Sequence, residues 1–259
     1  MSVFKGTFYS SALKRNTSIN VIFPERSGDV DPLFEDAPKV LYLLHGLSGN
    51  EDEWLRFTKI EYYAKKYNFI VVMPGADRSF YCNTRYGISY FDHIAKEVPS
   101  FVDSWFRIST KREDTFIAGE SMGGYGALKI GLSCPDRYAA IASLSGVVDY
   151  GAFADRIRRK EFTDMMPEEL DILDGQTDLL QLAEAVTGRK ERPKLLLQCG
   201  TEDFLYEDNQ RFRRSLEDLH YEHTYREGPG DHEWPYWDKA IQYAFMFFRD
   251  LDPEKMTIY

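Results

Sequence analysis

A serine flanked by two glycines is the residue of this chain best suited to chemistry. Residues 119–123 read Gly-Glu-Ser-Met-Gly, which matches the G-x-S-x-G pattern of a nucleophile elbow. In that motif a sharp turn exposes the serine hydroxyl, here that of Ser121, for attack on a carbonyl carbon. The pentapeptide alone is a modest signal, so its interpretation depends on the elements around it.

The sequence on either side of the motif supplies both of those elements. An apolar run at 116–118 predicts a buried strand, and an amphipathic pattern just beyond Gly124 predicts a helix. Where a strand turns at once into a helix, only hydrogen fits at the flanking glycines. The helix N-terminus would direct unpaired N–H groups and a partial positive charge at Ser121, which suits an oxyanion.

A serine nucleophile needs a base, and the base needs a carboxylate to hold it. Among the five histidines, His232 is the strongest candidate because it lies in a Gly-Pro-Gly loop after the last predicted strand. Asp203 follows another predicted strand, and the order serine, aspartate, histidine is that of α/β-hydrolases. Glu202 and Asp208 are the alternatives for the acid.

Two backbone N–H groups are expected to bind the tetrahedral oxygen of an acyl transfer. One belongs to Met122, directly after the nucleophile, and the other to Leu47, in a glycine-rich loop after an apolar strand. His45, in the same loop, is expected to shape it through hydrogen bonds. The candidate substrate-binding residues are His45, Trp54, Tyr81 and Trp234, with ordinary core or rim packing as the alternative for the three aromatic ones.

Strand and helix patterns alternate along most of the chain. This predicts an α/β fold, with a mostly parallel central sheet flanked by helices, in a single domain over residues 1–259. Runs at 3–13 and 18–23 predict a hairpin that forms an antiparallel edge. Further strands are predicted at 40–44, 69–73, 116–118, 139–144, 194–198 and 223–227, and helices at 53–67, 90–106, 207–219 and in a C-terminal segment through Phe248.

Two segments depart from the alternation. Residues 76–87 mix polar and aromatic side chains and are not expected to contribute a core element. Between 149 and 192 a long charged stretch with helical pieces predicts an insertion that caps the serine. The alternative is a helical excursion that covers one edge of the sheet.

Composition excludes several classes of partner. A net charge of −10 argues against nucleic acid and anionic membranes, and no apolar run approaches the length that spans a bilayer. The first residues lack the features of a secretory signal, so a cytoplasmic location is expected. The three cysteines are too dispersed for a metal knuckle, and neither a metal nor a cofactor is expected. The charge and the aromatic content permit a homo-oligomer without indicating one.

Taken together, these residues resemble the esterase D branch of the α/β-hydrolases, in particular the bacterial tributyrin-esterase group of small carboxylesterases. The resemblance covers nearly the whole chain and is carried by residues 43–50, Trp54, residues 69–74, Tyr81, Tyr86, Gly87 and residues 121–126. It implies a serine carboxylesterase that acts on short acyl esters, acetyl or butyryl, with acetylated or feruloylated sugars among the candidate substrates. It also implies the roles of Ser121, Asp203 and His232 position by position.

Related families leave alternatives open. S-formylglutathione hydrolases share the Ser-Met-Gly-Gly context but lack the His-Gly pair found here at positions 45–46, and feruloyl esterases share the core. A thioesterase or acyltransferase is therefore an alternative reading of the same apparatus. A binding protein that keeps the fold without the chemistry is another, although all three triad positions hold competent residues. Residues 149–192 match the family least, which leaves the shape of the acyl pocket open.

Overall fold

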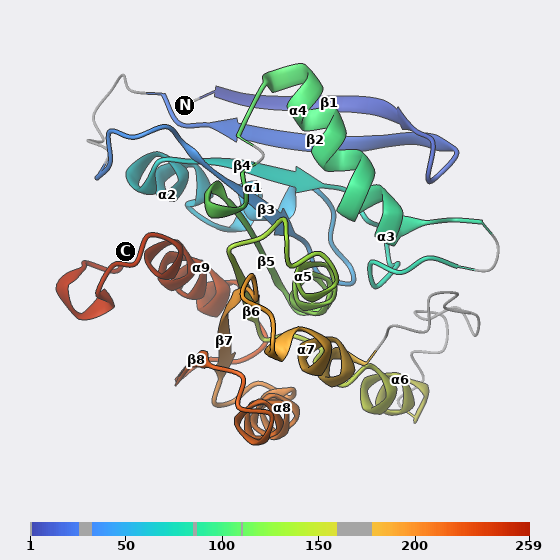
Figure 1. Cartoon of the computed structure of the whole chain (residues 1–259), viewed down its shortest axis with the longest axis vertical. Coiled ribbons are helices and arrows are strands. Elements are labelled where there is room, and N and C mark those ends of the chain that lie inside the picture. Colours follow the sequence, from blue (N-terminus) through green and yellow to red (C-terminus); the bar gives the residue numbers. More distant parts are fainter. Residues whose placement is uncertain (1, 26–32, 85–86, 110, 160–177) are drawn as a thin grey trace.

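The computed structural model describes residues 2–25, 33–84, 87–109, 111–159 and 178–259. Within them, eight strands form one sheet in the order β1-β2-β4-β3-β5-β6-β7-β8 (Figure 1). The strands are β1 (Ser2–Ser10), β2 (Arg15–Phe23), β3 (Lys39–Leu44), β4 (Phe69–Pro74), β5 (Thr115–Glu120), β6 (Ala140–Leu144), β7 (Lys194–Gly200) and β8 (His223–Gly228).

The sheet is antiparallel only at its N-terminal edge. β1 pairs with β2 in a hairpin that sets Ser2 opposite Phe23, and β2 runs antiparallel to β4. The other neighbours, from β4 through β3, β5, β6 and β7 to β8, are all parallel. The predicted hairpin edge and the predicted mostly parallel sheet are therefore confirmed.

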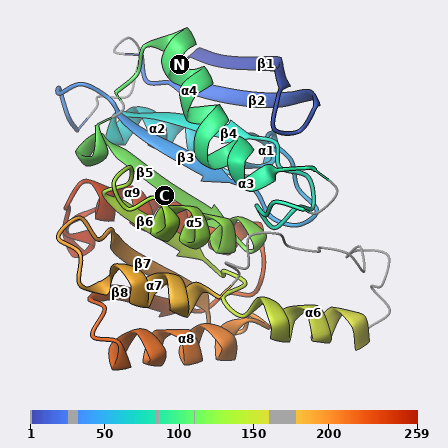
Figure 2. The ribbon, with the colours of Figure 1, turned by 45° about the vertical axis from the view of Figure 1, so that its right-hand side comes forward.

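Helices cover both faces of the sheet. In Figures 1 and 2, α2 and α9 lie on one side, and α4, α5 and α7 lie on the other. None of the helices in the described ranges is both long enough and apolar enough to span a membrane. The helices are α1 (Glu53–Phe57), α2 (Ile60–Tyr67), α3 (Tyr90–Asp92), a π-helical turn (His93–Glu97), α4 (Val98–Phe106), α5 (Met122–Ser133), α6 (Tyr150–Arg159), α7 (Leu179–Thr187), α8 (Tyr206–Asp218) and α9 (Trp234–Phe248), with short 3-10 turns at Arg112–Asp114 and Pro253–Lys255.

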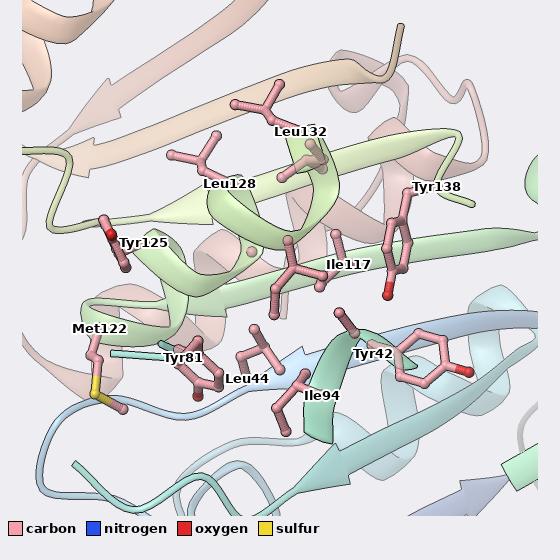
Figure 3. Packing of buried hydrophobic residues seen from close by; sticks show 14 of the residues in the cluster. Tyr42, Leu44, Tyr81, Ile94, Ile117, Met122, Tyr125, Leu128, Leu132 and Tyr138 are labelled. Carbon is pink, nitrogen blue, oxygen red and sulfur yellow. The ribbon is translucent and has the colours of Figure 1, made fainter. Parts of the chain in front are cut away.

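Strand β3 shows why its sequence is continuously apolar. Val40, Tyr42 and Leu44 pack into the core cluster on the α5 side, whereas Leu41 and Leu43 pack into the cluster on the α2 and α9 side. Successive side chains of a strand point to opposite faces, so a strand covered on both sides is apolar at every position. Figure 3 shows Tyr42 and Leu44 in the first of these clusters.

Helix α5 is buried almost all round, although its sequence predicts an amphipathic helix. Every residue from Met122 to Leu132 is buried, Lys129 included. Helix α5 packs on β5 and β6, and α7 packs against it from the same side of the sheet (Figure 1). Figure 3 shows Leu128 and Leu132 of this helix among the core side chains. The segment after β4 covers α5 as well, since Tyr81 packs against Gly126 and Sγ of Cys82 lies 3.0 Å from Nζ of Lys129.

Two further predictions are corrected by the structure. The helix expected at 53–67 is two helices, because Thr58 is extended and ends α1 before α2 begins at Ile60. Residues 76–87 do contribute to the core, since Phe80, Tyr81 and Cys82 are fully buried.

The segment 149–192 is described in part, because residues 160–177 lie outside the described ranges. Within it, α7 contributes Leu179, Leu182 and Ala183 to the core cluster on the α5 side and packs against α5 and α8. Helix α6 contributes Phe153 to the same cluster. The described residues do not test whether this segment caps the serine, so the cap stays a prediction.

Candidate active site

Ser121 lies in the turn between β5 and α5 with a strained backbone, φ 55° and ψ −117°. A residue with a side chain rarely adopts this left-handed region, which costs on the order of 1–3 kcal/mol and persists only where the surroundings enforce it. A Cβ atom at Gly119 would lie 2.4 Å from the carbonyl oxygen of Gly123, and one at Gly123 would lie 2.5 Å from that of Leu44. The prediction that only hydrogen fits at these glycines is confirmed.

The serine hydroxyl lies within hydrogen-bonding distance of the predicted base. Oγ of Ser121 is 2.9 Å from Nε2 of His232, and Nδ1 of the same ring is 2.9 Å from Oδ2 of Asp203. The Asp203 side chain is fully buried, and the imidazole keeps 18% of its surface exposed. With the proton on Nδ1 directed at the carboxylate, Nε2 is free to accept the hydroxyl proton.

The other carboxylates considered for the acid have different partners. Oε2 of Glu202 accepts a hydrogen bond from the N–H of Gly230 at 2.5 Å, which holds the pKa of this exposed carboxyl below its ordinary value. Asp208 pairs with Arg211 at 2.5 Å. Asp203 is therefore the one of the three that lies against His232.

The loops that carry the acid and the base touch backbone to backbone. A Cβ atom at Gly200 would lie 2.1 Å from the carbonyl oxygen of Gly230, and that oxygen accepts a hydrogen bond from the N–H of Glu202 at 3.1 Å. The second oxygen of Asp203, Oδ1, accepts from the N–H of Leu205 at 2.8 Å. The position of the carboxylate is thus set by the ends of β7 and β8 together.

Two aromatic rings, which the sequence analysis did not single out, flank the imidazole of His232. Phe204 lies with its ring centroid 4.7 Å away, and Trp237 stands edge-on at 4.9 Å. Phe204 directly follows Asp203, and Trp237 lies in the first turns of α9, shortly after His232. This closeness in the sequence to the acid and the base was the signal that could have identified them. These contacts restrict rotation of the ring away from Ser121.

The glycine-rich loop after β3 brings Leu47 to the same cavity as Ser121. His45 is buried beneath this loop, where its Nδ1 donates to the carbonyl oxygen of Gly46 at 2.7 Å and its Nε2 accepts from the N–H of Ala76 at 2.9 Å. Burial lowers the pKa of His45, consistent with a neutral ring. Met122 is the first residue of α5, where backbone N–H groups lack intrahelical acceptors.

A cavity of 540 Å³ opens beside the serine. Of the four candidate substrate-binding residues, Trp234 lines this cavity, whereas His45, Trp54 and Tyr81 are buried behind its walls. The indole of Trp54 donates to the carbonyl oxygen of Leu44 at 3.1 Å, and the hydroxyl of Tyr81 donates to that of His45 at 2.8 Å. These three support the site through their neighbours. The lining comprises Gly46, Leu47, Ser48, Gly49, Glu53, Glu120, Ser121, Phe153, Phe204, His232, Glu233, Trp234, Pro235 and Trp237.

Three carboxyl groups that the sequence analysis did not identify also line the cavity: Glu53, Glu120 and Glu233. Burial raises the pKa of Glu120 well above its ordinary value, and the charge of Glu53 raises it further. Burial also raises the pKa of Glu53. In the described part of the chain, histidine, cysteine and carboxylate side chains form no group of three or more that could hold a metal ion.

Comparison with known proteins identifies the family. Residues 10–248 match the family model described as "Putative esterase". The chain is 34% identical to an acetyl esterase of Caldicellulosiruptor saccharolyticus over 95% of this chain and 97% of that protein.

Two solved structures from Staphylococcus aureus resemble this one in sequence and fold. The fluorophosphonate-binding serine hydrolase F, in a substrate-bound state, is 37% identical with a TM-score of 0.83. The S-formylglutathione hydrolase FrmB, as apoenzyme, is 35% identical with a TM-score of 0.80. Each comparison covers 95% of this chain and 98% of the other. The chain therefore belongs to the "Putative esterase" family, has the α/β-hydrolase fold and is a serine carboxylic ester hydrolase.

Proposed function

We propose that this chain hydrolyses short-chain acyl esters through an acyl intermediate on Ser121. The contacts of His232, at 2.9 Å to Ser121 Oγ and 2.9 Å to Asp203 Oδ2, carry the proposal. Serine is a weak nucleophile at neutral pH, and a base held by a carboxylate is the usual means of activating it. Ser121 is then the nucleophile, His232 the general base and acid, and Asp203 the group that stabilises the imidazolium.

In the first half of the reaction, Oγ of Ser121 attacks the ester carbonyl carbon while its proton passes to Nε2 of His232. The tetrahedral oxyanion accepts hydrogen bonds from the N–H groups of Leu47 and Met122. His232 returns the proton to the leaving alcohol as the C–O bond breaks. In the second half, a water molecule that loses its proton to His232 attacks the acyl carbon, and the acid leaves as Ser121 regains its proton.

The acyl groups that we propose are acetyl to butyryl. Phe153, Phe204 and Trp234 give the cavity beside the serine apolar walls, which suit a short alkyl chain. The relative from Caldicellulosiruptor saccharolyticus, described as an acetyl esterase, supports the short end of this range.

Charge favours neutral alcohols over glutathione as the leaving group. Glu53 and Glu233 line the cavity, so a substrate that carries carboxylates, as glutathione does, meets like charge there. Acetylated or feruloylated sugars are neutral, and their hydroxyl groups can donate hydrogen bonds to carboxylate oxygens. The alternative, a thioesterase or acyltransferase that resembles S-formylglutathione hydrolases, has the 35% identical FrmB in its favour.

A substrate panel separates these readings. We expect kcat/KM for p-nitrophenyl acetate, p-nitrophenyl butyrate and acetylated sugars to exceed that for S-formylglutathione by at least about tenfold, a difference of about 1.4 kcal/mol. Glu233→Gln should raise kcat/KM for S-formylglutathione and leave that for the p-nitrophenyl esters unchanged. A preference for S-formylglutathione in the unmodified protein would replace the esterase proposal with the thioesterase one.

A fluorophosphonate probe tests the nucleophile directly. The probe should label the protein once, the label should map to Ser121 by mass spectrometry, and Ser121→Ala should abolish both labelling and ester turnover. Ser48→Ala is the matched control, because Ser48 is an exposed serine in the lining of the same cavity. Full turnover in Ser121→Ala would reject the mechanism.

Three finer assignments stay predictions from the sequence. They are membership of the esterase D and tributyrin-esterase subgroup, a cytoplasmic location, and the state of oligomerisation. Assays on purified protein and size-exclusion chromatography with light scattering address the first and the last.

A further inference from the structure

The loop that follows β3 is covered by two carboxyl groups. Oε1 of Glu120 lies so close to Gly46 that a Cβ atom there would be 2.4 Å from it, and Oε2 of Glu53 would be 2.5 Å from a Cβ atom at Gly49. Glu120 is 2% exposed, is the last residue of β5 and directly precedes Ser121. A buried acid thus links the nucleophile strand to the loop that carries Leu47.

Both polar groups of Gly46 are held by side chains from different parts of the chain. The carboxyl group of Glu120 packs against Gly46 and interacts with its N–H, and the carbonyl oxygen of Gly46 accepts from Nδ1 of His45 at 2.7 Å. Glycine has the widest backbone freedom of all residues, so these two anchors restrict torsions that the residue itself leaves open. The carbonyl of Gly46 shares a planar trans peptide with the N–H of Leu47, and the two point in opposite directions. Fixing Gly46 therefore fixes the direction of the Leu47 donor.

The charge of Glu120 matters because the group lines the same cavity as Ser121. An ionised carboxylate there would oppose the negative oxygen that forms on the substrate, and in a poorly solvated site this repulsion is strong. Burial and the neighbouring Glu53 both raise the pKa of Glu120, and these effects are larger than that of the Gly46 N–H, which lowers it. An uncharged carboxylic acid can still accept a hydrogen bond through its carbonyl oxygen.

We propose that Glu120 is a positioning residue that holds Gly46 so that the N–H of Leu47 faces the oxyanion. The role belongs to the ester hydrolysis proposed above and rests on it. Glu120 acts through Gly46 and Leu47, so its removal should lower kcat and leave KM for a small ester nearly unchanged.

Two variants of matched length test the proposal. Glu120→Gln is uncharged and keeps a carbonyl oxygen for the Gly46 N–H, so we expect kcat for p-nitrophenyl acetate within about threefold of the unmodified protein. Glu120→Met has no such acceptor, and we expect kcat to fall by about tenfold to a hundredfold, the scale of a misplaced catalytic group. A loss in Glu120→Gln as large as in Glu120→Met would overturn the proposal, because it would show that an ionisable carboxyl is needed. Full activity in Glu120→Met would overturn it as well.

A second measurement reports on the oxyanion site itself. A small boronic acid forms a tetrahedral anionic adduct on a serine nucleophile, so its inhibition constant follows the binding of the oxyanion. We expect inhibition to weaken in Glu120→Met by about the same factor as kcat/KM and to stay unchanged in Glu120→Gln. Inhibition of Glu120→Met as tight as that of the unmodified protein would assign Glu120 a merely structural role.

The controls separate this inference from the proposed function. Absence of esterase activity in the unmodified protein would reject the function, whereas activity there together with an unimpaired Glu120→Met would reject only the role of Glu120. If Glu120→Met does not fold, Gly46→Ala provides the second test, because its Cβ atom would displace the Glu120 carboxyl from 2.4 Å. We expect the same loss of kcat in that variant, and unchanged kcat would count against the proposal.

Discussion

Gly123 packs against the carbonyl oxygen of Leu44 so closely that a Cβ atom at Gly123 would lie 2.5 Å from it. Gly123 lies in the first turn of α5, just after the serine, and Leu44 is the last residue of β3, just before the loop of Leu47. The spacing between the nucleophile and the proposed oxyanion loop is therefore set by a backbone contact. Because the two main chains are in direct contact, no side chain lies between them that could move to accommodate a larger residue.

The first prediction follows from this contact. Gly123→Ala should lower the free energy of unfolding by about 3 kcal/mol, at the upper end of overpacking effects, because a carbonyl group cannot move aside as a side-chain tip can. Activity should fall together with stability. Gly188→Ala is the control, since nothing lies within 4 Å of a Cβ atom there and the change should stay within about 0.5 kcal/mol. Equal urea midpoints for the two variants would contradict the argument.

The second prediction concerns the acid. In Asp203→Asn the amide would donate to Nδ1 of His232 and leave the ring proton on Nε2, where it cannot accept the proton of Ser121. We expect kcat to fall by about 10³- to 10⁴-fold with little change in KM. Glu202→Gln keeps an oxygen for the Gly230 N–H and should retain activity within a few fold. A larger loss in Glu202→Gln than in Asp203→Asn would reassign the acid.

The third prediction concerns His45, which is buried beneath the oxyanion loop. His45→Phe keeps a ring of similar size but removes the hydrogen bonds to Gly46 and Ala76. Because the Leu47 donor would lose one of its two supports, kcat should fall by about tenfold to a hundredfold while KM changes little. His223→Phe, at the partly exposed start of β8, serves as the control. An increase in KM with unchanged kcat would instead point to direct contact between His45 and the substrate.

The fourth prediction is a pH dependence of stability. Burial lowers the pKa of His45 below its ordinary 6.5, so the unfolded chain binds a proton there before the folded protein does. This contribution to stability is complete above pH 6.5 and is lost as the pH falls below 6.5 toward the lowered pKa, with a slope of up to about 1.4 kcal/mol per pH unit. Urea unfolding between pH 8 and pH 5 should therefore show a shallower decline in His45→Phe than in the unmodified protein.

The comparison with the variant is needed because the pKa values of other buried groups are shifted as well. Burial also lowers the pKa of His93, which adds to the decline, whereas the raised pKa of Glu120 makes the folded protein take up protons first and acts in the opposite direction. These groups are present in both proteins, so the difference between the two curves isolates His45. Parallel curves would show that His45 is not held neutral.

Much of the fold follows from the sequence because its signals are local. Continuous apolar runs mark strands covered on both faces, and their order along the chain predicts the parallel sheet that the structure contains. The elbow is equally local, since Gly119 and Gly123 are required by the turn that Ser121 makes. Chain order and loop position also sufficed to nominate His232, which lies in contact with the serine, and Asp203, which lies in contact with His232.

What the tertiary structure decided is which way side chains point and what covers them. Helix α5 has an amphipathic sequence but is buried almost all round, because α7 and the segment of Tyr81 and Cys82 pack against it from distant parts of the chain. Trp54 and Tyr81 are behind the cavity walls, since their polar atoms bond to backbone carbonyl oxygens of the strand end and loop at positions 44–45. In the sequence, Glu120 is only a variable position of the G-x-S-x-G motif. The packing of β5 against the loop of Gly46 buries its carboxyl group beside the serine. How deeply a side chain is buried and which way it points depend on contacts between segments far apart in the chain, and local sequence patterns do not encode these contacts.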